Sequence, residues 1–194
     1  LAQIYTRQGK LDNAIKCYLD ILKIDYGNKS ALRELGVLYA TQQKVDLALE
    51  KLEQAVEKGE QDLDMFSLMA DLYVEKKEFT KAILLLKRAQ TIDPDNINLA
   101  MDLADLYGKQ GYTPEAIEQY HRLLLKNPND PDAWSSLGFL YLQIEKDDDA
   151  IRCFEKSFEY GNDDPNAHCE LGYLYFKNKK YDLAEKEYEE SIFL

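Results

Sequence analysis

The chain has 194 residues, of which 45% are hydrophobic and 31% charged, a composition ordinary for one or two folded domains or one elongated array. Its formal net charge of −12 argues against nucleic acid as the main partner, because that binding depends on Lys and Arg. The same charge disfavours anionic membrane surfaces, and no apolar run approaches the roughly 20 residues that span a bilayer.

A period of 34 residues runs through the whole chain without an insertion or deletion. Tyrosine recurs at Tyr5, Tyr39, Tyr73, Tyr107, Tyr141 and Tyr175. Alanine recurs at Ala14, Ala48, Ala82, Ala116, Ala150 and Ala184. A fixed period of this length indicates tandem structural repeats. We expect a truncated repeat over 1–28 and further repeats over 29–62, 63–96, 97–130, 131–164 and 165–194.

Each repeat predicts two helices joined by a short turn. In the first and fourth repeats, Gly9 and Gly111 are typical of a helix C-terminus. The third and fourth repeats close at Pro94 and Pro128, which end their second helices. In the fourth repeat, Thr113 precedes a proline and predicts a capping hydroxyl at the start of the second helix.

The fifth repeat shows the pattern most fully. Its apolar residues fall at helical spacing before and after a break near residues 145–146, and acids at 147–149 open the second helix. The residues that carry the pattern are Trp134, Leu137, Gly138, Tyr141, Ala150 and Phe154, with Pro128 closing the repeat before. This set resembles the tetratricopeptide repeat in residue type and spacing.

The resemblance covers essentially all of residues 1–194 and implies an all-α fold. Proteins of this family are α-α superhelices, or solenoids, built from tandem 34-residue helix-turn-helix repeats, and we expect a single array of this kind. The first helix of each pair then lines a concave groove. The resemblance also implies that the chain holds other proteins.

Two groups of residues are expected to face that groove. Asp71 and Asp105 stand at equivalent positions one repeat apart, and with Asp64 and Asp102 they predict an acidic middle. Aromatic residues toward the C-terminal end predict an apolar patch, made of Phe139, Tyr173 and Phe176. Such a groove favours a protein or peptide segment with Lys or Arg and apolar anchors. The alternative is that the acids are ordinary solvated surface residues.

No motif for catalysis, phosphate binding or metal binding is present. His121 and His168 are the only histidines, and neither can be placed beside a nucleophile and an orienting acid. The three cysteines lack CxxC spacing and suggest unpaired thiols in a reducing compartment. We therefore expect a cytoplasmic, non-enzymatic protein without a cofactor or metal.

Two alternative functions stay open. The terminal repeats lack polar caps, so we expect the natural chain to continue, or its uncapped ends to associate into a homo-oligomer. A self-assembling oligomeric scaffold is thus one alternative. A regulatory repeat region of an enzyme whose catalytic domain lies outside this sequence is the other.

Overall fold

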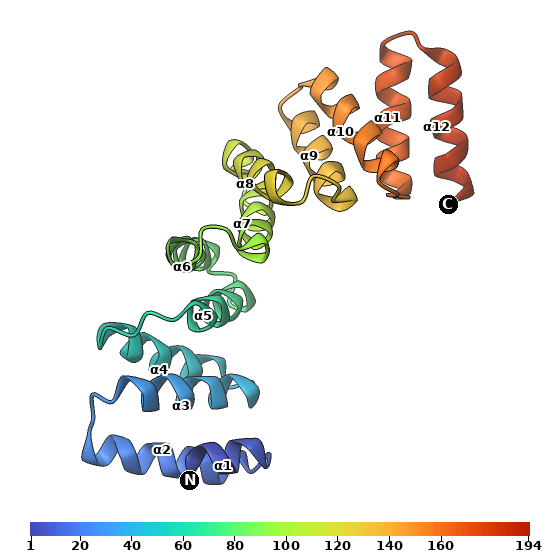
Figure 1. Cartoon of the computed structure of the whole chain (residues 1–194). Coiled ribbons are helices and arrows are strands. Elements are labelled where there is room, and N and C mark those ends of the chain that lie inside the picture. Colours follow the sequence, from blue (N-terminus) through green and yellow to red (C-terminus); the bar gives the residue numbers. More distant parts are fainter. The chain divides into compact units, whose positions relative to one another are not determined.

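A computed structural model describes all of residues 1–194, which form twelve helices and no strand (Figure 1). This confirms the all-α fold of tandem helix pairs. The chain divides into two compact units, unit 1 over Leu1–Pro94 and unit 2 over Asp95–Leu194, which are described separately. A single array over 1–194 stays a prediction.

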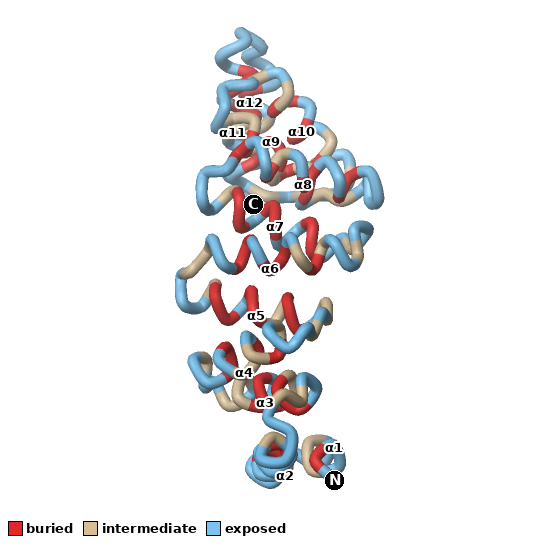
Figure 2. Tube along the Cα trace, turned by 90° about the vertical axis from the view of Figure 1, so that its left-hand side faces the viewer, coloured by how far each residue is buried: buried red, intermediate tan, exposed pale blue.

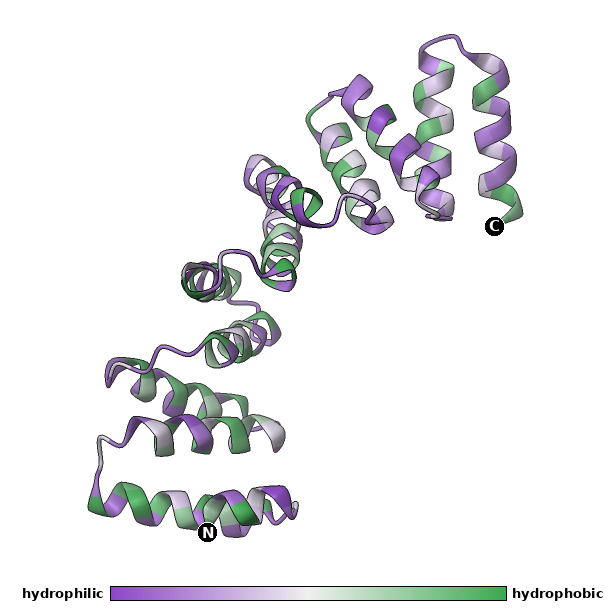
Figure 3. Ribbon diagram, viewed as in Figure 1, coloured by the Kyte–Doolittle hydropathy of each residue, from purple (hydrophilic) through white to green (hydrophobic).

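Each unit contains three helical hairpins. Unit 1 holds α1 (Ala2–Arg7), α2 (Leu11–Ile24), α3 (Lys29–Thr41), α4 (Val45–Glu57), α5 (Leu63–Glu75) and α6 (Phe79–Ile92). Unit 2 holds α7 (Ile97–Lys109), α8 (Thr113–Lys126), α9 (Pro131–Gln143), α10 (Asp147–Glu159), α11 (Pro165–Lys177) and α12 (Tyr181–Phe193). Figure 3 shows bands of hydrophobic residues along these helices and hydrophilic connections such as that between α4 and α5.

The first helices from α3 onward begin in the same way. A short polar side chain precedes each one and accepts a hydrogen bond from a backbone N–H of the first turn, which satisfies a donor that has no partner within the helix. These capping residues also recur every 34 residues, at Asn28, Asp62, Asn96, Asp130 and Asp164. The cap therefore sets where each of these repeats begins.

The turn within each hairpin contains one residue with left-handed backbone. Gly9 and Gly111, at φ +70° and +75°, follow the ends of α1 and α7, as the sequence predicts. The equivalent positions in the other hairpins have φ between 57° and 60° but carry side chains, at Gln43, Lys77, Glu145 and Lys179. Left-handed backbone costs a residue with a Cβ atom about 1–2 kcal/mol, so these four turns are strained.

Small residues allow the two helices of a hairpin to approach closely. The alanines of the second helices are fully buried from Ala14 to Ala150, and Figure 2 shows such buried segments along the helices. In α9, a Cβ atom on Gly138 would lie 2.7 Å from the ring of Phe154 on α10. Such a contact is impossible without movement, so the glycine is required by the packing.

Successive hairpins within a unit are tied by side-chain contacts at fixed spacing. The Tyr175 hydroxyl on α11 donates a 2.7 Å hydrogen bond to Glu155 on α10. A second tie joins the start of a second helix to the end of the next first helix: the Thr113 hydroxyl donates to Gln143 Oε1 at 3.2 Å. The predicted capping role of Thr113 is therefore wrong, because its hydroxyl reaches the next repeat while α8 begins without a side-chain cap.

Candidate functional site: a cleft over α9 and α11

An open cleft of about 720 Å³ lies over the first helices of the last two repeats in unit 2. Its apolar lining comes from Phe139 and Leu142 on α9 and from Tyr173 and Leu174 on α11. Phe139 and Leu142 are half-buried, whereas Tyr173 is 53% exposed. The cleft thus offers an apolar surface with one large aromatic side chain open to a partner.

The remaining lining residues are polar and mostly acidic. Glu145 and Asp147 lie at the turn into α10, and Glu170 lies on α11. The single cation of the lining, Lys177, forms an ion pair with Asp147. Glu145 and Glu170 form no ion pair, and the three carboxylates of the lining outnumber its one cation, so the electrostatic balance favours a positively charged occupant.

Packing against α10 holds Phe139 in place. Its ring meets the ring of Phe154 edge to face, with centroids 5.1 Å apart and an interplanar angle of 76°. Phe154 is fully buried and passes over Gly138, where no side chain could fit. Because aromatic pairs of this geometry are favourable, Phe139 presents a fixed apolar surface to the cleft.

Phe176 does not join this cleft. The sequence places it with Phe139 and Tyr173, but its ring packs edge to face on Tyr181 at the start of α12, with centroids 5.6 Å apart. The residue is still 55% exposed. The structure therefore brings together two of the three predicted aromatic residues.

The four predicted acids lie in different surroundings. In unit 2, Asp102 and Asp105 are on α7, and Asp105 accepts a 2.6 Å hydrogen bond from the Tyr120 hydroxyl on α8. In unit 1, Asp64 and Asp71 are on α5. All four residues are exposed. An acidic middle made by all four together stays a prediction, since they belong to separate units.

Asp71 differs from Asp105 in having no polar partner. Its carboxylate makes no hydrogen bond or ion pair, and removal of solvent by the neighbouring atoms raises its pKa above the ordinary value of 3.8. Asp105 is held within its own hairpin, and burial together with the hydrogen bond to Asp105 raises the pKa of Tyr120. Asp71 is the acid that would gain more from a cation.

The polar residues of the cleft at 143, 145, 147 and 177 were not predicted as groove residues. One signal is present in the sequence: Thr113 and Gln143, like Asp147 and Lys177, are 30 residues apart, and both pairs are in contact. A polar residue opening a second helix and another ending the next first helix indicate such a contact between repeats.

One histidine and one cysteine, His168 and Cys153, are buried in the packing between helices. His168 is buried, with Nδ1 2.7 Å from a carboxylate oxygen of Glu187 and its ring stacked on Phe158 at 3.8 Å. Burial raises the pKa of the Cys153 thiol to about 12, so it is not a reactive thiolate at neutral pH.

No group of three His, Cys, Asp or Glu side chains could hold a metal ion. None of the helices has the length and apolar content needed to cross a bilayer.

Comparisons with known proteins agree with this architecture. A family profile described as "Tetratricopeptide repeat" matches residues 73–138, and a second profile with the same description matches residues 1–63, 42–97 and 140–193. No match is found among curated protein sequences.

Two solved structures illustrate the likeness. One, "Crystal structure of MamA", is 25% identical over 82% of this chain and 94% of that chain, with a TM-score of 0.69. The other is YrrB, described as "a TPR protein with an unusual peptide-binding site". It is 20% identical over 92% of this chain and 88% of that chain, with a TM-score of 0.73. At 20% sequence identity, the likeness to YrrB shows a shared fold and no more.

Proposed function

Because the chain belongs to the tetratricopeptide-repeat family, whose fold serves as a protein-interaction scaffold, we propose that the cleft over α9 and α11 docks a partner segment. The segment is a peptide or an exposed stretch of another protein that carries basic and apolar side chains. The chain acts by holding this partner, without chemistry of its own.

The composition of the cleft is the observation that carries the proposal. Apolar anchors of a partner would pack on Phe139, Leu142 and Tyr173, and a Lys or Arg would lie between Glu145 and Glu170. Partly exposed aromatic residues are frequent hot spots of protein interfaces, since they bury a large area with few rotatable bonds. Acidic residues around them add specificity for a cationic partner and speed its association.

The other acids extend this preference. The unpaired Asp71 carboxylate in unit 1 already loses part of its hydration, so a partner ammonium or guanidinium group would relieve that cost. We propose Asp64, Asp71, Asp102 and Asp105 as additional sites for basic side chains. The peptide-binding site named for YrrB supports a peptide as the kind of ligand that a related fold accepts.

The test begins with the intact chain as bait and identification of the captured protein by mass spectrometry. The affinity of that partner is then measured for Tyr173→Ala and Glu170→Lys. We expect each variant to weaken binding about tenfold or more, and added salt to weaken binding to the unaltered chain.

Two matched controls use exposed residues outside the cleft. Tyr112→Ala removes an exposed tyrosine in unit 2 that does not line the cleft, and Glu185→Lys reverses an exposed acid on α12. Both should leave the affinity within about twofold of the unaltered chain, as is usual for exposed positions outside an interface. Unchanged binding in the two cleft variants, or equal losses in the controls, would refute the proposal.

A further inference from the structure

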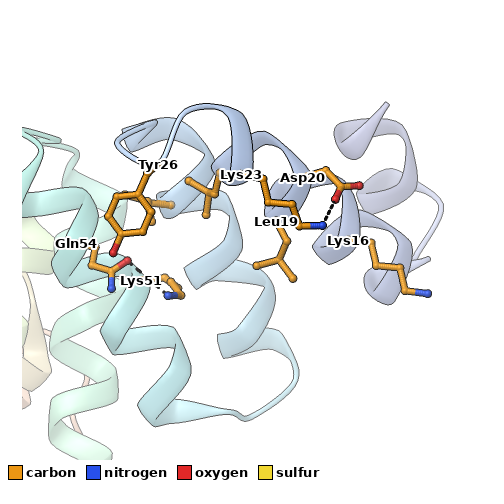
Figure 4. A pocket seen from close by; sticks show the side chains of 9 residues that line it. Lys16, Leu19, Asp20, Lys23, Tyr26, Lys51 and Gln54 are labelled. Atoms are coloured by element: carbon orange, nitrogen blue, oxygen red, sulfur yellow. Dashed lines mark hydrogen bonds and ion pairs between the residues drawn. The ribbon is translucent and has the colours of Figure 1, made fainter.

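A second cleft, of about 700 Å³, lies in unit 1 on the side of the second helices (Figure 4). It is lined mainly by α2 and α4, and Leu32 of α3 also contributes to the lining. Its charge is opposite to that of the cleft in unit 2. Three lysines and one acid line it, at Lys16, Lys23, Lys51 and Asp20.

The lysines of this cleft are not fully neutralised. Lys23 Nζ lies 2.7 Å from Asp20, an exposed pair that contributes little. Lys51 pairs at 2.7 Å with Glu50, and its own side chain is only 20% exposed. Lys16 has no ion pair. A cleft with this excess of ammonium groups attracts carboxylates, although the whole chain is strongly acidic.

The cleft is also apolar. Leu19, Leu22, Leu32 and Tyr26 line it, and Tyr26 is 73% exposed. Figure 4 shows the labelled Leu19 and Tyr26 among the lysine side chains. Apolar residues framed by charges of one sign are typical of a surface that binds an amphipathic segment of the opposite charge.

The repeat architecture does not require these lysines. One period later, the positions of Lys16 and Lys23 are occupied by Glu50 and Glu57 on α4. Both α2 and α4 fold into the same kind of helix, so the charge of these positions is independent of the packing. Lys16 and Lys23 are seven residues apart and therefore share one face of α2.

We infer that the cleft between α2 and α4 docks an acidic amphipathic segment of a partner protein. The carboxylates of the segment would meet Lys16, Lys23 and Lys51, and its apolar side chains would pack on Leu19 and Tyr26. The chain would then have two docking surfaces of opposite charge preference, one in each unit.

The probe for this inference is an amphipathic helical peptide of about 15 residues, long enough to form a helix, with glutamates flanking leucine and phenylalanine. Its counterpart carries lysine in place of every glutamate. Binding of each fluorescently labelled peptide to the full chain is measured by anisotropy. We expect the glutamate peptide to bind, with an affinity that falls as salt is added, and the lysine peptide to bind elsewhere or not at all.

Charge reversal identifies the surface. Lys16→Glu combined with Lys23→Glu should lower the affinity for the glutamate peptide at least tenfold. The matched control, Lys10→Glu with Lys87→Glu, reverses two exposed lysines outside the cleft and gives the same net charge. It should change the affinity by no more than about twofold. All four positions are exposed, so the variants should keep the circular dichroism of the unaltered chain.

Three results would overturn the inference: no binding of the glutamate peptide, equal losses in both double variants, or self-association that Lys16→Glu with Lys23→Glu abolishes. The last result would make the occupant a second copy of this chain. Tyr173→Ala should leave binding of the glutamate peptide unchanged, so this inference and the proposed function can fail independently.

Discussion

The hydroxyl of Tyr175 donates a 2.7 Å hydrogen bond to the carboxylate of Glu155, which lies 20 residues earlier on the preceding second helix. The same spacing recurs within unit 2 in Tyr141 and His121, 3.0 Å apart, and within unit 1 in the contact of Tyr73 with Glu53. The recurring tyrosine therefore contributes a polar contact between repeats in addition to its ring in the core.

Tyr175→Phe tests this contact. The variant keeps the ring but loses the hydrogen bond, and Glu155 is exposed enough to be hydrated again. We expect the free energy of unfolding to fall by about 1 kcal/mol, measured by urea denaturation. Tyr173→Phe is the control: its hydroxyl makes no hydrogen bond within the chain, so a loss as large as that of Tyr175→Phe would contradict the interpretation.

The hydrogen bonds of the tyrosine hydroxyls also predict that the free energy of unfolding falls at alkaline pH. Burial and then hydrogen bonds to carboxylates raise the pKa of Tyr73, Tyr120 and Tyr175 above the ordinary value of 10.0. The folded chain thus holds these protons more tightly than the unfolded chain. Their contribution is fully present below pH 10.0 and is lost as the pH rises through the raised folded pKa values.

Replacing all three tyrosines by phenylalanine should therefore flatten the decline of stability above pH 10.0. The comparison is made between denaturation midpoints of the variant and the unaltered chain across a pH series. An alkaline decline equally steep in both proteins would show that these hydroxyls do not cause it.

Two glycines on first helices of unit 2 should respond to alanine in opposite ways. At Gly138, a Cβ atom would lie 2.7 Å from Phe154, so Gly138→Ala should destabilise the chain by about 1–3 kcal/mol through overpacking. At Gly108, the nearest atom would be Leu140 Cδ2 at 3.7 Å, an ordinary contact. Gly108→Ala should stabilise by up to about 1 kcal/mol, because alanine favours the helix. Thermal melts of both variants decide the point, and shifts of the same sign would contradict it.

The two equivalent aspartates should also differ. Asp105→Ala leaves the buried Tyr120 hydroxyl without its acceptor and should cost about 1–2 kcal/mol. Asp71→Asn removes a desolvated, unpaired charge and should leave stability unchanged or slightly raised. Urea midpoints for the two variants test this difference. A larger loss for Asp71→Asn than for Asp105→Ala would be inconsistent with the contacts described above.

The sequence predicts the parts of the fold that depend on spacing. Ala150, Phe154 and Gly138 recur in phase because each fills a fixed place where two helices meet. Side-chain direction is harder to predict, because it depends on the rotamer and the neighbours. Spacing alone groups Phe176 with Phe139 and Tyr173, and it does not predict the edge-to-face contact of the Phe176 ring with Tyr181.

Contacts between repeats explain why the predicted capping role of Thr113 is wrong. The spacing of Thr113 and Pro114 is typical of a helix cap, but the hydroxyl reaches Gln143 in the next repeat. The ion pair of Asp147 and Lys177 similarly depends on two long-range neighbours. Within one repeat, Thr113 is interpreted as a capping residue and Asp147 as a charge at the start of a helix. Their contacts with Gln143 and Lys177 become visible only when two repeats are packed together.

Mapping a basic and apolar probe peptide on the isotopically labelled full chain by NMR is the most direct test of the proposed docking cleft. A peptide with alternating lysine and leucine should shift the amide signals of Phe139, Leu142 and Tyr173, and the shifts should weaken as salt is added. The proposed docking cleft would be contradicted if the shifts were confined to other helices. It would also be contradicted if a peptide with glutamate in place of lysine shifted the signals of Phe139, Leu142 and Tyr173 equally.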